Sequence, residues 1–198
     1  MSTVDFSQLL PPSLITELSY EAIFTKRKES FISLYDASEQ QAVRELLQRE
    51  SEPVVKLLQE NAYLEMLYQA KCNADARSLL LAYAEKSDLD HLALTEYGLT
   101  RLVVTPADNT VIPPVEAVYE SDERLRERCI LSFDGMNTAG SANAYRYFTL
   151  SADGRVDGIK VKSDEATPCF LDIVITQVDS ENGAASEELI QIIQTALD

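Results

Sequence analysis

The chain has 198 residues, of which 45% are hydrophobic, so it can bury a real core as one large domain or two small ones and is not a disordered protein. Its net charge of −16 argues against nucleic acid as a partner, because phosphate binding needs clustered bases. No apolar run approaches the roughly 20 residues of a membrane span, and three widely spaced cysteines indicate reduced thiols in a cytoplasm.

The first third of the chain is predicted to be helical after an extended arm. Residues 1–16 form the arm, because two consecutive prolines forbid a helix there. From 17 to 35 apolar residues recur at helical spacing. Ser38, with Gln41 three residues later, has the pattern of a capping box and opens a further helix.

The longest predicted helix runs over residues 51–84, with Ser51 as its N-cap, and measures roughly 50 Å at about 1.5 Å per residue. Its apolar residues form two stripes, a third of a turn or more apart, which leave only a narrow polar strip. Short neighbouring helices cannot cover that much apolar surface. We therefore expect part of it to bind a partner, with the second stripe as the candidate interface: Leu57, Leu64, Leu67 and Tyr68.

A short helix closed by Gly98 ends this helical part, since glycine supplies the left-handed residue that helix ends favour. Residues 101–120 are then predicted to be a linker with a strand at each end, over 102–105 and 115–119.

The remaining residues predict a small α/β domain in the order helix, helix, strand, strand, helix. Ser121, the Gly140-Ser141 pair and Ser186 are placed to start the three helices. Gly158 marks a bulge in the first strand, and the second strand, 169–178, is expected to be largely buried. Two strands are marginal alone, so the sheet should borrow 102–105 or 115–119, or a strand from beyond Asp198.

The predicted fold class is therefore α+β: a helical domain with one long helix, followed by a small α/β domain. The expected boundaries are residues 1–100 for the helical domain with its arm, 101–120 for the linker and 121–198 for the α/β domain.

The sequence contains no pattern that indicates catalysis, a metal or a cofactor. The one histidine, His91, lies in an acidic turn and is interpreted as a surface residue. The cysteines lack the spacing of a zinc site, and neither a phosphate-binding loop nor a nucleophile elbow is present. We therefore expect neither an enzyme nor a protein that binds a small-molecule substrate.

Half of the net charge lies at one end of the chain. Residues 163–198 contain eight acids and no Lys or Arg, a local charge of −8. This segment forms either a solvated face or an acidic patch that attracts a basic partner. The second reading gives an alternative function, an acidic adaptor or decoy that binds a basic protein.

Short blocks follow one another along essentially the whole chain: 50–58, 60–63, 89–93, 97–102, 113–114, 119–122, 124–126, 139–141, 144–145, 151–156, Ile159 and Val161. The most specific are Ala139-Gly140-Ser141 and Ser151-Ala152-Asp153-Gly154-Arg155-Val156. Together and in this order, the blocks resemble the baseplate assembly protein J family of contractile phage tails and related tailocins.

The resemblance implies a non-enzymatic subunit of the baseplate wedge in the virion tail, assembled in the cytoplasm of the bacterial host. It implies that two such subunits associate with each other and with one copy of a second wedge protein through a helical bundle. Wedges then join into a ring around the hub and spike. Family members continue past the position of Asp198, so we expect a chain shortened relative to the family.

Overall fold

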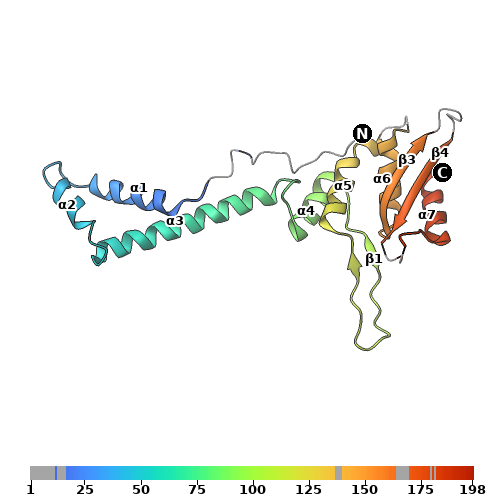
Figure 1. Ribbon diagram of the computed structural model, residues 1–198, viewed down its shortest axis with the longest axis horizontal. Helices are drawn as coiled ribbons and strands as arrows, with labels where there is room; N and C mark the ends of the chain where they lie inside the picture. Colours follow the sequence, from blue (N-terminus) through green and yellow to red (C-terminus); the bar gives the residue numbers. More distant parts are fainter. Residues whose placement is uncertain (1–11, 13–16, 137–139, 164–169, 179, 181) are drawn as a thin grey trace. The chain divides into compact units, whose positions relative to one another are not determined.

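The computed structural model describes residues 12, 17–136, 140–163, 170–178, 180 and 182–198 (Figure 1). The expected arm, apart from Pro12, and Cys169 lie outside these residues. Contacts divide the chain into two compact units, a helical unit within residues 10–80 and an α/β unit within residues 81–198. The boundaries expected near residues 100 and 120 stay predictions.

The helical unit is built on α3, along which α1 lies (Figure 1). Ser19 caps α1 by accepting from the backbone N–H of Ala22. The core of the helical unit consists of Ile32, Leu47, Val55 and Leu58, with Phe24 and Phe31 packed against them. The three helices are α1 Tyr20–Ile32, α2 Gln40–Leu46 and α3 Pro53–Ser78.

Helix α3 is shorter than the sequence predicts. It has 26 residues, and its N-cap is Glu52 rather than Ser51. At about 1.5 Å per residue its length is roughly 39 Å. Residues 79–83 form a turn, and the guanidinium of Arg126 donates to the carbonyls of Leu81 and Ala84, both at 2.7 Å. These carbonyls are thus satisfied by a side chain rather than by a continuing helix.

The first part of the α/β unit packs α4 against α5. Gly98, at φ 67°, ends α4 in the left-handed conformation, as predicted. Ser121 caps α5 by accepting from the N–H of Arg124, also as predicted. The helices are α4 Lys86–Tyr97 and α5 Asp122–Leu131. Their shared core consists of Ala84, Leu89, Ala93, Leu99, Leu125 and Cys129.

The two strands predicted in the linker exist, and they pair with each other. Strand β1, Val103–Thr105, runs antiparallel to β2, Val118–Tyr119, and a bridge joins Asp108 to Val115 further out. The expectation that either strand joins the C-terminal sheet is therefore wrong. The hairpin connection explains this, because consecutive strands pair most readily with each other.

The C-terminal part has the predicted order of helix, strand, strand, helix after α5, with a short 3₁₀ helix, η2 Asp134–Met136, inserted. Ser141 and Ser186 cap α6 and α7 as predicted, and the register shift at Gly158 confirms the bulge. The core beneath the sheet is formed by Leu131, Leu150, Val156, Leu189 and Ile193. The elements are α6 Ala142–Ala152, β3 Val156–Ser163, β4 Leu171–Gln177 and α7 Glu187–Leu197.

Strand β4 is not largely buried, so that expectation is wrong. Every residue of β4 is at least partly exposed; Leu171 and Val174 are 40% and 50% exposed. Helices α6 and α7 pack on one face of the β3–β4 sheet, and no second layer covers the other face among the described residues (Figure 1). Apolar residues on both faces of a strand predict two covering layers, and only one is present.

Candidate protein–protein interface

Helix α3 carries apolar side chains on two opposite faces. Val55, Leu58 and Ala62 are buried, and Val55 and Leu58 belong to the core shared with α1 and its neighbours. Because an α-helix turns about 100° per residue, Leu57 and Leu64 lie roughly 180° away from Val55 around the helix axis. The face opposite the core is therefore also apolar.

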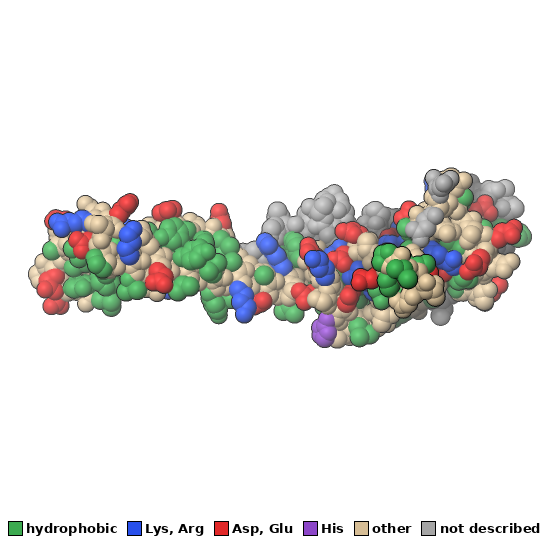
Figure 2. All heavy atoms as spheres, turned by 90° about the horizontal axis from the view of Figure 1, so that it is seen from below, with side chains coloured by type: hydrophobic (Ala, Val, Ile, Leu, Met, Phe, Trp, Pro, Cys, Tyr) green, Lys and Arg blue, Asp and Glu red, His purple; other side chains and the backbone are tan. Residues whose placement is uncertain are grey.

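The four residues predicted as a partner interface all lie on this uncovered side. Leu57, Leu64, Leu67 and Tyr68 are 56%, 54%, 46% and 68% exposed. Tyr63, 51% exposed, borders the same sector, although the sequence analysis did not include it. Figure 2 shows hydrophobic side chains gathered along the helical unit on the face in view. We call these five residues the α3 apolar face.

A polar contact also joins α3 to α1. Glu65 accepts a hydrogen bond from Arg27 of α1 at 2.6 Å, and Gln69 donates to the other oxygen of the same carboxylate at 3.5 Å. Within the chain Glu65 therefore contacts α1, whereas the five side chains of the α3 apolar face stay exposed.

One polar interaction lies on the α3 apolar face itself. A hydrogen bond with the thiol of Cys72, one turn further along, raises the pKa of the Tyr68 phenol. The two side chains are neighbours because residues four apart share a helix face. The tyrosine thus presents an apolar ring with a polar end, a combination that is enriched at protein interfaces.

A second exposed apolar region is the tip of the β1–β2 hairpin. Ile112 is 99% exposed and Val111 is 42% exposed. The base of the hairpin is held by Arg101, which donates to the Glu120 carbonyl and to Asp122, both at 2.7 Å. The sequence predicts only a linker here, because apolar residues between prolines give no periodic signal.

The described residues offer neither a cluster of metal ligands nor a membrane-spanning helix. No group of three or more His, Cys, Asp or Glu side chains that could hold a metal ion occurs among the described residues. His91 is exposed, as expected. None of the described helices is long and apolar enough to span a bilayer.

The sequence is similar to known baseplate proteins. Residues 50–108 match the family described as Baseplate J-like N-terminal domain. Over 197 residues the chain is 44% identical to "Baseplate protein J" of Escherichia phage P2, an alignment that covers 100% of this chain. The chain belongs to the baseplate J-like family. It spans 64% of the length of the P2 protein.

The matched domain of the baseplate J-like family contains the α3 apolar face. Residues 50–108 include all of α3 and α4 and run through β1. The long helix with its uncovered side thus belongs to the part of the chain that identifies the family, and the family is one of phage baseplate proteins.

Proposed function

We propose that this chain is a non-enzymatic structural subunit of the baseplate wedge of a phage-type contractile tail. It lies in the virion tail baseplate, where it associates with a second copy of itself and with a second wedge protein. The α3 apolar face is the surface through which it joins the helical bundle of the wedge. No nucleic acid, membrane or small-molecule substrate takes part.

The observation that carries the proposal is an uncovered apolar helix face within a chain 44% identical to a baseplate protein. Fully burying one Leu side chain contributes on the order of 1.5–3 kcal/mol. The exposed Leu57, Leu64 and Leu67 can therefore supply several kcal/mol of association free energy when a partner helix covers them. A surface of this kind is characteristic of a subunit of an assembly.

The test is association of the full chain, measured by light scattering over a wide range of concentration, alone and with the co-expressed neighbouring wedge protein. We expect the wild-type chain to self-associate and to co-purify with its partner. Leu64→Glu places a carboxylate at the centre of the α3 apolar face and should abolish both interactions. Circular dichroism should remain unchanged, because the side chain is exposed.

A matched control is Leu94→Glu. Leu94 is 55% exposed on α4, so the substitution makes the same chemical change at similar exposure in the other unit. It should leave association intact. A wild-type chain that stays monomeric at high concentration and does not co-purify with the wedge protein would refute the proposed function.

A further inference from the structure

Strand β4 has a free edge on the side away from β3. Gln177 donates its N–H to the carbonyl of Gly183 on that side, at 3.1 Å, and Val178 donates toward β3, to the carbonyl of Arg155 at 2.9 Å. Because the backbone groups of successive strand residues alternate in direction, Leu171 and Ile173 also point their N–H and C=O groups away from β3. Among the described residues no strand pairs with either of them there.

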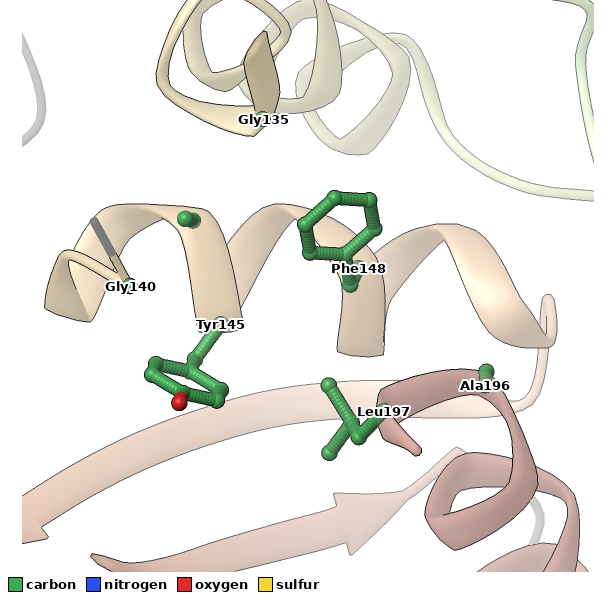
Figure 3. Close-up of a pocket in the computed structure, with 7 residues that line it drawn as sticks. Gly135, Gly140, Tyr145, Phe148, Ala196 and Leu197 are labelled. Atoms are coloured by element: carbon green, nitrogen blue, oxygen red, sulfur yellow. The ribbon is translucent and has the colours of Figure 1, made fainter. Parts of the chain in front are cut away.

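This free edge borders an apolar groove. The groove has a volume of about 670 Å³ and lies between β4 and α7. It continues toward a smaller cavity of about 360 Å³, because Tyr145 and Leu197 line both. Figure 3 shows Tyr145 on α6 and Leu197 on α7 beside the strands. The apolar residues that line the groove are Tyr145, Leu171, Ile173, Val174, Ile175, Ala184, Ala185, Ile190, Ile193 and Leu197.

The edge and the groove together fit one kind of occupant, a third β-strand. A strand added beside Leu171 and Ile173 pairs with their free backbone groups, and its inward side chains lie over α7, where Ile190 is 48% exposed. Its outward side chains lie on the other face, next to Asp172 and Val174, which are both exposed. The inward positions therefore require apolar residues.

The charges near the edge of β4 indicate which side chains suit the outward positions of an added strand. Asp172 lies opposite Lys162 of β3 on one side, and β4 and α7 themselves contain no Lys or Arg that could face it from the other side. The groove itself is lined by Asp198 and by no basic residue. Opposite charges across a strand pair contribute roughly 0.2–1 kcal/mol, whereas like charges destabilise. A Lys or Arg opposite Asp172 is favoured, and a second copy of β4 would bring Asp172 near an identical carboxylate.

We propose that the free edge of β4 and the groove beside α7 form a docking site for an extended segment of a partner protein. In this segment apolar side chains alternate with Lys or Arg. The segment becomes the third strand of the β3–β4 sheet, its apolar residues cover α7 and its basic residues face Asp172. This site is separate from the α3 apolar face, and it does not depend on the proposed wedge function.

The test uses an acetylated and amidated peptide in which Lys alternates with Val and Ile, titrated into the labelled full chain and followed by NMR. The backbone amides of Leu171 and Ile173 and the methyl groups of Ile190 and Leu197 should shift together. Two matched peptides serve as controls. One carries Glu in place of each Lys, and the other is N-methylated along the edge that faces β4; neither should bind, because the first repels the acids and the second cannot pair.

Two protein variants separate strand docking from general charge attraction. Asp172→Lys should weaken binding of the Lys peptide about two- to fivefold, from the loss of one cross-strand pair. Glu60→Lys makes the same change in net charge on α3 and should leave the affinity unchanged at moderate salt. Equal binding of the N-methylated peptide, equal effects of the two variants, or shifts confined to other elements would overturn the proposal. So would a dimer of the chain that protects the same amides without peptide.

Discussion

Arg128 of α5 and Glu120 at the end of β2 form a buried ion pair in the α/β unit, with side chains 4% and 0% exposed. The Arg128 guanidinium also donates to the carbonyl of Thr100 at 3.2 Å and to Ser151 Oγ at 3.3 Å. The same carboxylate oxygen of Glu120 accepts from the N–H of Leu102 at 3.0 Å. The pair thus joins α5, the β1–β2 hairpin and α6.

Removing one partner of this pair should be strongly destabilising. Glu120→Ala leaves the Arg128 charge buried without a counter-ion, and we expect a loss of about 3–5 kcal/mol in the free energy of unfolding. Urea denaturation measures it. The double variant Glu120→Leu/Arg128→Met should recover most of the loss, because replacing both charges by apolar groups is often neutral. Equal instability of the single and double variants would contradict this account.

The carboxylate of Asp122 should make stability depend on pH. Burial raises its pKa, but hydrogen bonds from the Lys86 N–H and from Arg101 prevail, so the pKa lies below the usual 3.8. Because the carboxyl has a lower pKa in the folded than in the unfolded chain, it stabilises the fold fully above pH 3.8. This stabilisation is lost as the pH falls through the folded-state pKa, where the carboxylate becomes protonated. Asp122→Asn should therefore lower the urea midpoint at pH 7 and make a smaller difference near the acid limit. A difference independent of pH would rule out this role.

Two adjacent leucines of α3 should differ strongly in how much their truncation destabilises the chain. Leu58 is 8% exposed and belongs to the core with Val55, so Leu58→Ala should cost about 2–5 kcal/mol. Leu57 is 56% exposed, and Leu57→Ala should change the stability of the monomer by no more than about 0.5 kcal/mol. Thermal unfolding at low protein concentration compares them. Similar losses would mean that both faces are covered in solution.

The thiols of Cys72 and Cys129 should differ in reactivity. Cys72 is exposed, whereas Cys129 is buried between α4 and α5, and burial raises the pKa of its thiol to about 11. Only the thiolate reacts, so at pH 8 iodoacetamide should label Cys72 quickly and Cys129 only after unfolding. Peptide mapping by mass spectrometry gives the two rates. Equal rates in the native chain would show that the α4–α5 core opens readily.

The sequence predicted those features that depend on neighbouring residues. Ser121, Ser141 and Ser186 cap their helices because a hydroxyl beside the first turn needs only the N–H three residues later. The same reasoning failed for Ser38 and Ser51. There Glu39 and Glu52 occupy the N-cap positions without a side-chain bond, because the preceding chain is already in a turn.

The features that the sequence did not predict depend on distant groups. The early end of α3 accompanies hydrogen bonds from Arg126, more than forty residues along the chain. The outer face of β4 is uncovered because α6 and α7 pack on the same face of the sheet, and β3 and β4 stay a two-stranded sheet because β1 pairs with β2. The local periodicity of the sequence predicts neither the early end of α3 nor the uncovered face of β4.

The candidate interface was predictable from the sequence only in part. Helical periodicity placed Leu57, Leu64, Leu67 and Tyr68 on one stripe, and that follows from 3.6 residues per turn alone. Which of the two stripes is covered depends on α1, and α1 packs on the other face through the core that Ile32 shares with Val55 and Leu58. Helical periodicity alone thus predicts the stripe, whereas its exposure depends on where α1 packs.

Gly154 lies close to the β1–β2 hairpin. A Cβ added to Gly154, in the turn before β3, would lie 2.3 Å from the carbonyl oxygen of Val103 in β1, so backbone must move. Gly154→Ala should cost about 1–3 kcal/mol through overpacking, and hydrogen exchange of β1 and β2 should quicken. Lys160→Ala, at an exposed position of β3, should leave both unchanged. Unaltered exchange in the Gly154 variant would show that the hairpin is not seated on this turn.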